Sequence, residues 1–246
     1  MILIAAVLGA VVGSFLNVVI HRLPRGESLV RPGSRCPRCG TGIHWYYNLP
    51  LLGWLIVRGK CAECHQPISA RYPAVEALTA VCFILPVTLG SSGWRMVLEW
   101  AFLAVLIAIA FIDLEHQIIP NVIVLPAAAA GLAAAIALEP KHWWEFLIGS
   151  ACAAVFLLLL ALIWPGGMGL GDVKMALLMG AVLGRYVIVA VFLGFLFGGL
   201  VGILLILLGL RGRRDRIPFG PFLAMGSAVA LLWGEKILTT YLTMYH

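Results

Sequence analysis

Long apolar runs separated by short polar breaks fill most of this sequence. Eight runs suit membrane-spanning helices, because a span needs about 20 apolar residues, and fewer where neighbouring helices bury it. We expect these helices at about residues 2–20, 73–90, 95–112, 119–138, 144–164, 172–184, 187–210 and 219–242. Only Gly184-Arg185 separates the short sixth run from the seventh, so seven helices are the main alternative. The composition, 62% hydrophobic and 11% charged, is that of a membrane protein.

Basic residues gather in two of the polar breaks. Eight of the 17 Lys and Arg residues lie between Arg22 and Arg71, and four more arginines lie within 211–216. Loops rich in Lys and Arg stay in the cytoplasm, so we place residues 21–72 there. If the helices then alternate in direction, the same side receives the breaks at 113–118, 165–171 and 211–218. Nucleic-acid binding, the other interpretation of basic clusters, is not favoured because both clusters border membrane spans.

The first apolar run has no basic stretch before it, and its charges follow at His21 and Arg22. A cleaved signal peptide normally begins with basic residues and ends in a small-residue cleavage site. We therefore expect a retained first transmembrane helix over residues 1–20, starting outside the cytoplasm. Residues 21–72 then form a cytoplasmic loop domain, and residues 73–246 form a multi-helix membrane domain.

Two C-x2-C pairs lie in the predicted cytoplasmic loop. Four thiolates with this spacing suit a tetrahedral zinc ion, as in zinc ribbons, and Gly40 helps the first pair turn back on itself. Two disulfides are the alternative, but cytoplasmic thiols stay reduced. A four-cysteine site has no open position, so the Zn²⁺ is expected to be structural. Its predicted ligands are Cys36, Cys39, Cys61 and Cys64. The expected fold is an all-α polytopic membrane protein of about eight helices with a small zinc-ribbon-like cytoplasmic loop domain.

Two aspartates lie where apolar runs meet polar breaks on the predicted cytoplasmic side. Asp113 ends one span, and Asp172 begins another within Gly169-Leu-Gly-Asp172. Acidic groups at a membrane helix are costly and are usually functional. Two carboxyl groups that meet in space can share a proton and hydrolyse a peptide bond, one as base and one as acid. The sequence therefore predicts Asp113 and Asp172 as the catalytic pair of a membrane aspartyl protease.

The alternative for Asp172 is a structural one, because Asp commonly caps helix starts. Catalysis is favoured because Gly166, Gly167, Gly169 and Gly171 clear space for a substrate backbone. Lys174 follows Asp172 by two positions and is expected on a different helix face, where it tunes local charge.

Six features of the sequence occur together: the stretches Gly13 to Pro24 and Arg71 to Glu76, the two cysteine pairs, Asp113 with the following Ile119-Pro120, Gly169 to Lys174, and Ile217 to Phe222. Over nearly its whole length the chain resembles the type IV prepilin peptidases, which are leader peptidases with N-methyltransferase activity. One departure is Asn121, where the family often has an acidic residue.

The resemblance implies an aspartic endopeptidase of the bacterial inner (cytoplasmic) membrane whose active site, Asp113 and Asp172, faces the cytoplasm. Its substrates and partners would be prepilins and pseudopilins of type IV pili or type II secretion, beside membrane lipid. Cleavage would follow a glycine behind a short basic leader. The new N-terminal residue, usually Phe, would be methylated with S-adenosylmethionine. The cysteines carry over as zinc ligands, whereas no residue carries over for the methyl donor.

The main competing hypothesis is a proton- or cation-coupled membrane carrier, with the zinc loop as a docking module. Inverted repeats would favour a carrier, and the sequence has no convincing internal similarity. A structural assembly factor without chemistry is a third hypothesis. The sequence identifies neither the individual substrates nor the oligomeric state.

Overall fold

The structure is a computed structural model that describes residues 1–36, 38–164, 168–210, 212 and 217–244. It divides the chain into two compact units, Met1–Ser92 and Gly93–His246. The predicted domain boundaries at residues 20 and 72 stay a prediction. Several residues invoked in the sequence analysis lie outside the described ranges: Gly166, Gly167, Arg211, Arg213, Arg214 and Arg216.

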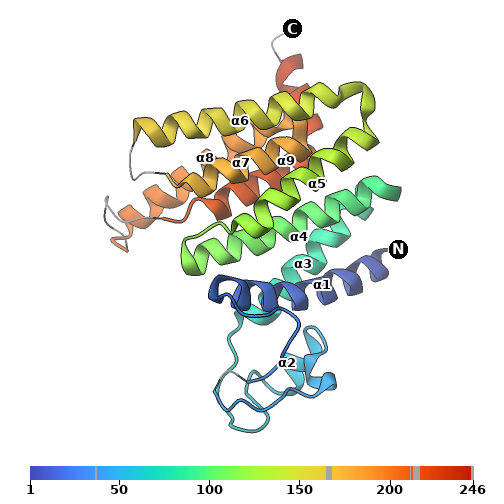
Figure 1. The fold of residues 1–246 in the computed structure, drawn as a ribbon, viewed down its shortest axis with the longest axis vertical. Coiled ribbons are helices and arrows are strands. Elements are labelled where there is room, and N and C mark those ends of the chain that lie inside the picture. The colour runs from blue at the N-terminus through green and yellow to red at the C-terminus, as the bar shows by residue number, and fades with distance from the viewer. Residues whose placement is uncertain (37, 165–167, 211, 213–216, 245–246) are drawn as a thin grey trace. The chain divides into compact units, whose positions relative to one another are not determined.

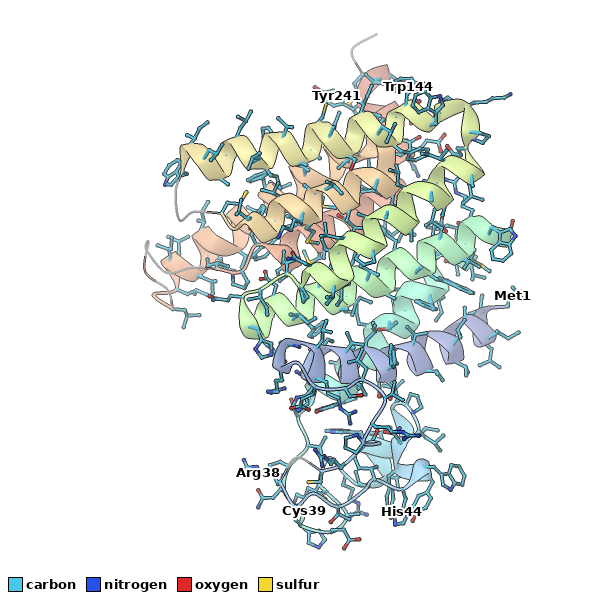
Figure 2. The ribbon with its side chains drawn as sticks, in the orientation of Figure 1. Met1, Arg38, Cys39, His44, Trp144 and Tyr241 are labelled. Carbon is cyan, nitrogen blue, oxygen red and sulfur yellow. The ribbon has the colours of Figure 1, made fainter. Side chains whose placement is uncertain are left out.

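The first unit contains two long helices and the loop between them (Figure 1). Small residues let the two long helices touch: a Cβ added to Gly13 would lie 2.7 Å from the Glu76 Cα atom. In the loop, Arg38 and Cys39 lie on one side and His44 on the other (Figure 2). The elements are α1 (Ile2–Arg22), η1 (Leu23–Arg25), η2 (Trp45–Asn48), α2 (Leu52–Ile56) and α3 (Arg71–Thr88).

The second unit is a bundle of six α-helices among its described residues. They are α4 (Gly93–His116), α5 (Asn121–Leu138), α6 (Trp143–Ile163), α7 (Leu170–Leu183), α8 (Val187–Leu207) and α9 (Gly220–Thr243), with η3 (Pro140–His142) and η4 (Gly184–Tyr186) between them. The main packed pairs are α6 with α7, α8 with α9, α5 with α7, and α4 with α9.

Helix α7 is the core of this bundle. It has 14 residues, and nine of them are buried. A Cβ on Gly180 would lie 2.4 Å from backbone atoms of Gly149 and Ser150 in α6, so only glycine permits this approach. Because protein rather than lipid surrounds α7, a short helix suffices at this position.

The predicted all-α membrane fold is confirmed, and the eight expected segments correspond within a few residues to α1 and α3 to α9 of the described chain. The predicted count of eight spans is not confirmed. Six segments of the described chain are long and apolar enough to cross a membrane. One of the six, Leu170–Leu207, joins α7, η4 and α8, and α3 is not among them.

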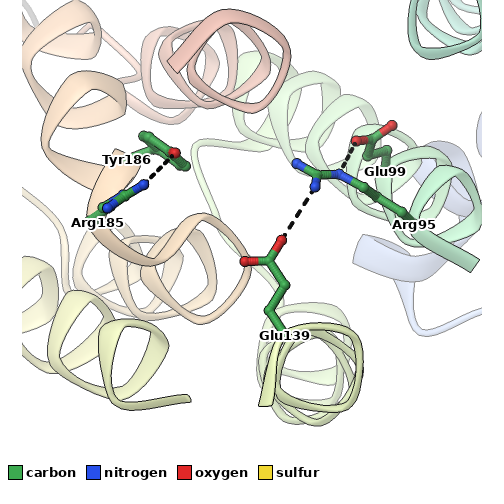
Figure 3. A network of polar contacts seen from close by, with 5 residues as sticks. All are labelled: Arg95, Glu99, Glu139, Arg185 and Tyr186. Atoms are coloured by element: carbon green, nitrogen blue, oxygen red, sulfur yellow. Dashed lines mark hydrogen bonds and ion pairs between the residues drawn. The ribbon is translucent and has the colours of Figure 1, made fainter. Parts of the chain in front are cut away.

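At one end of the bundle, charged residues pair with one another (Figure 3). Arg95 near the start of α4 lies 3.4 Å from Glu99 and 3.3 Å from Glu139, which follows α5. In η4, Arg185 contacts Glu145 of α6 at 3.5 Å and donates a hydrogen bond to the Tyr186 hydroxyl. These pairs join the starts of α4 and α6 to the ends of α5 and α7.

Candidate functional site

Asp113 lies near the end of α4 and is 6% exposed. The Gly220 N–H, at the start of α9, donates a hydrogen bond of 3.0 Å to Asp113 Oδ2. A Cβ on Gly220 would lie 2.7 Å from the same oxygen. A side chain at position 220 would therefore displace the carboxylate. The stretch Ile217 to Phe222 carried the family resemblance, but sequence reasoning gave Gly220 no role.

Asp172 lies in the first turn of α7 and is 7% exposed. Its Oδ2 accepts a hydrogen bond of 3.0 Å from the Gly169 N–H, the residue that caps the helix. Asp172 therefore does make a hydrogen bond at the start of its helix, as the structural alternative of a capping role proposed. This bond engages Oδ2, and a capping role for that oxygen is compatible with chemistry at Oδ1.

The two aspartates lie in the same unit, Asp113 near the end of α4 and Asp172 in the first turn of α7. The end of α4 and the start of α7 lie at the same end of the bundle (Figure 1). The structure thus brings together two buried carboxyl groups that are distant in sequence. Each carboxyl group is held by the backbone N–H of a glycine.

The start of α7 packs on the segment that precedes α5. A Cβ on Gly171 would lie 3.0 Å from the Ile119 Cβ. Lys174 Nζ donates a hydrogen bond of 2.7 Å to Asn121 Oδ1. Sequence reasoning treated Asn121 only as a departure from the family and Lys174 only as a local charge. The structure makes them partners that tie α7 to the start of α5.

The four loop cysteines form a second candidate site, in the first unit. All four sulfur atoms lie within 4.8 Å of one another. Cys36 and Cys64 Sγ are 3.8 Å apart, and Cys39 and Cys61 Sγ are 4.0 Å apart. Four sulfur ligands about 2.3 Å from a tetrahedral zinc ion lie about 3.8 Å from one another. The arrangement therefore fits the predicted zinc ion without the neighbouring histidines.

The two cysteine pairs share one backbone geometry. The Gly40 N–H donates to the Cys36 carbonyl and the His65 N–H to the Cys61 carbonyl, at 2.9 and 3.0 Å. Both donor residues have a positive φ, 75° at Gly40 and 55° at His65. The predicted turn at Gly40 is present, and His65 takes the same place in the second pair.

Two of the four thiols have a lowered pKa, whereas burial and hydrogen bonds with the other cysteines raise the pKa of the Cys64 thiol to about 11. Hydrogen bonds with the side chain and backbone of Thr41 lower the pKa of the Cys39 thiol to about 6. Backbone hydrogen bonds at Cys64 and Glu63 lower the pKa of Cys61. A lowered pKa favours the thiolate, which is the form that binds zinc.

Known families match both units. Residues 7–89 match the family described as the bacterial peptidase A24 N-terminal domain, and residues 100–203 match the type IV leader peptidase family. No solved structure matches the chain.

Curated relatives named prepilin leader peptidase/N-methyltransferase match most of the chain, and three of them show the degree of similarity. The protein of Aeromonas hydrophila is 37% identical, covering 95% of this chain and 91% of the relative. That of Pseudomonas aeruginosa is 35% identical, covering 98% and 93%. That of Bacillus subtilis is 34% identical, covering 99% of both chains. The carrier hypothesis has no support among these relatives.

Proposed function

Because the chain belongs to the type IV leader peptidase family, we propose that it cleaves prepilins with Asp113 and Asp172 as its catalytic pair. The family and the names of its relatives support an aspartic peptidase with N-methyltransferase activity. The observation that carries the residue assignment is that two buried carboxyl groups, distant in sequence, lie at the same end of the bundle (Figure 1).

In the proposed mechanism the two carboxyl groups hold one proton between them, since close like charges do not readily ionise together. The ionised aspartate removes a proton from water, which attacks the scissile carbonyl. The protonated aspartate donates its proton to the carbonyl oxygen, which gives a tetrahedral intermediate. The C–N bond then breaks as the leaving nitrogen receives the proton taken from water, and the new hydroxyl returns its proton to the other aspartate as the carboxyl group forms. The N–H groups of Gly169 and Gly220 orient the carboxylates for these transfers.

The proposed substrates are prepilins and pseudopilins of type IV pili or type II secretion, cut after a glycine at the cytoplasmic face of the bacterial inner membrane. The cytoplasmic orientation is supported by the eight basic residues between Arg22 and Arg71. An active site at that face suits a substrate with a short basic leader ahead of one apolar helix.

A zinc ion bound by Cys36, Cys39, Cys61 and Cys64 is proposed to fold the loop domain of residues 21–72. Four thiolates complete a tetrahedral shell, so the metal would act through structure and not through chemistry. Methylation of the new N-terminal residue would use S-adenosylmethionine, as the relatives' names imply.

The function is tested with the purified protein, a synthetic prepilin and S-adenosylmethionine, followed by mass spectrometry. We expect one cut after the leader glycine and a mass increase of one methyl group on the new N-terminal residue. Without the methyl donor, the cut remains and the added mass is absent. An intact prepilin under conditions where the protein is folded and zinc-loaded would contradict the proposal.

Gly220 is expected to position Asp113. In Gly220→Ala the added methyl group would overlap Asp113 Oδ2, so the carboxylate must move. A displacement of about 1 Å at a reacting group costs about a hundredfold in rate, and we expect a loss of that order in kcat for prepilin cleavage.

Gly199→Ala is the matched control, because an added Cβ at Gly199 in α8 meets no atom within 4 Å. It should cleave at the unchanged rate. Equal kcat values for the two variants would show that Gly220 does not position Asp113. A Gly220→Ala protein that fails to fold would be recognised by its loss of thermal stability in detergent. In that event Asp113→Glu, which moves the carboxylate without adding bulk at position 220, tests the same requirement.

A further inference from the structure

An apolar segment interrupts the zinc loop between its two cysteine pairs. Residues 45–57, here called the apolar lobe, contain no charged residue and include η2 and α2. Several of its large side chains are exposed, with Trp45 78% and Leu55 61% exposed. A group of large exposed apolar side chains so close together in sequence is a candidate interaction surface. The exposed large side chains are Trp45, Tyr46, Leu49, Leu52, Leu55 and Ile56.

The apolar lobe is attached to the long helices of its unit by a buried carboxylate. The Leu51 N–H, just before α2, donates a hydrogen bond of 2.7 Å to Glu76 Oε2 in α3. Glu76 is only 8% exposed and also hydrogen-bonds Ser14 of α1. Leu51 has φ 61°, a left-handed backbone conformation that is unfavourable for a non-glycine residue. The contact to Glu76 thus holds the lobe in a backbone conformation that it would not adopt unaided.

The position of Glu76 along α1 and α3 indicates how deep in the membrane its hydrogen bond to Leu51, here called the anchor, would lie. Glu76 packs against Gly13, nine residues before Arg22 at the end of α1. At 1.5 Å per residue that is about 13 Å from the charged end of the helix. On α3, Glu76 lies five residues, about 7 Å, from Arg71. One leaflet of the hydrocarbon core is about 15 Å thick, so both measures place the anchor inside a leaflet.

The view of this unit agrees with that depth. In Figure 1, α2 lies level with the middle of α1 along the direction of the α1 axis. In Figure 2, His44 lies toward the end of the unit where Met1 begins α1, and Arg38 lies toward the opposite end. The chain just before the lobe therefore lies toward the start of α1, and the basic Arg38 lies toward the opposite end.

Part of the backbone of the apolar lobe is hydrogen-bonded within the protein, as a membrane requires of irregular structure. Away from water, each backbone polar group needs a partner within the protein. Pro50 has no N–H, Leu51 donates to Glu76, and Gly53 donates to the Leu49 carbonyl at 2.8 Å. The Trp54 indole N–H donates to the Ile68 carbonyl at 3.3 Å.

We propose that the apolar lobe re-enters the membrane and lies among lipid chains, in the leaflet next to the Arg22 end of α1. Lipid is the expected occupant because Val11 and Phe15 of α1, at the same level, expose apolar side chains. Arg58 and Lys60 follow the lobe directly and suit anionic headgroups. The lobe has 13 residues, mostly apolar apart from Asn48. It is too short to span a bilayer, and its length suits a re-entrant segment.

The test uses the full-length zinc-loaded protein at one copy per nanodisc of phosphatidylcholine and phosphatidylglycerol, without prepilin. Leu55→Cys, at a position 61% exposed, is compared with Val30→Cys, an apolar position in the loop outside the lobe that is 81% exposed. Both variants carry Cys82→Ala and Cys152→Ala. A water-soluble maleimide should label position 55 at least tenfold more slowly than position 30. A bimane fluorophore attached at 55, and not at 30, should be quenched by lipids with brominated acyl chains.

Equal labelling rates without quenching would put the lobe in water and overturn the proposal. Slow labelling without quenching would mean that another part of the same chain, and not lipid, covers the lobe. This result would also overturn the proposal. A second copy or a prepilin cannot supply that cover in these nanodiscs. Zinc content verifies the fold of each variant, and Leu52→Cys repeats the test if Leu55→Cys loses zinc. The outcome does not depend on catalysis, so it stands apart from the proposed function.

The anchor is tested in the same nanodiscs with the bimane at position 55. Glu76→Gln keeps an acceptor for the Leu51 N–H, so quenching should persist. Glu76→Leu leaves that N–H without its partner, and quenching should fall toward the value at position 30. Equal quenching in the two variants would remove Glu76 from the proposal.

Discussion

An Asp113→Asn protein is expected to insert into the membrane and fold, yet to cleave prepilin at least about a thousandfold more slowly. Asp172→Asn should have the same effect. An amide is nearly isosteric with a carboxyl group, but it neither accepts a proton from water nor supplies one to the scissile carbonyl. Because the two groups act as one unit, the double variant should be little worse than either single variant.

The measurement is the rate of prepilin cleavage in detergent by mass spectrometry, with circular dichroism as the test of folding. Glu235→Gln is the matched control, since it makes the same change of acid to amide on exposed helix α9 surface, 15 residues beyond Gly220. It should retain full activity. Normal cleavage by a folded Asp113→Asn or Asp172→Asn protein would exclude the proposed catalytic pair. The hypothesis of an assembly factor without chemistry requires that prepilin processing is retained with the double variant.

The helices could be predicted from sequence because each apolar run is bounded by charges or glycines that cannot stay in lipid. The number of spans could not, because α7 is short for a reason that only packing reveals. Its nine buried residues are surrounded by neighbouring helices. Gly149 and Gly180, which allow that close packing, look in sequence like any other small residues of a membrane helix.

The candidate site also contains residues that the sequence predicts and residues that only the packing of helices reveals. Asp113 and Asp172 could be predicted because an acid at a helix end in a lipid-soluble chain is costly and therefore conspicuous. Their glycine partners differ. Gly169 lies three residues from Asp172, so local reasoning reaches it, whereas Gly220 lies 107 residues from Asp113. Contacts between residues so far apart in sequence depend on how α4 and α9 pack, and a local sequence pattern does not predict that packing.

Replacing Cys36 or Cys61 by serine is expected to reduce bound zinc from one ion per chain to about none. A structural zinc site contributes about 10–16 kcal/mol to the folding of a small domain, and a serine hydroxyl does not replace a thiolate ligand. The loop has little else to hold it together. Between residues 27 and 70, only Cys36, Gly53 and Gly59 are buried among the described residues, so there is almost no apolar core. Zinc is measured by native mass spectrometry and loop order by limited proteolysis.

Cys152→Ser is the matched control, because Cys152 is a free cysteine of α6 outside the zinc site. It should keep its zinc and its resistance to protease. The four-cysteine site and the aspartates belong to different units, so the zinc-free protein should still fold its helix bundle. Its thermal unfolding in detergent should then show a melted loop beside an intact membrane unit. Full cleavage and methylation by a protein shown to be free of zinc, with a loop still resistant to protease, would mean that the thiol cluster folds the loop without a metal.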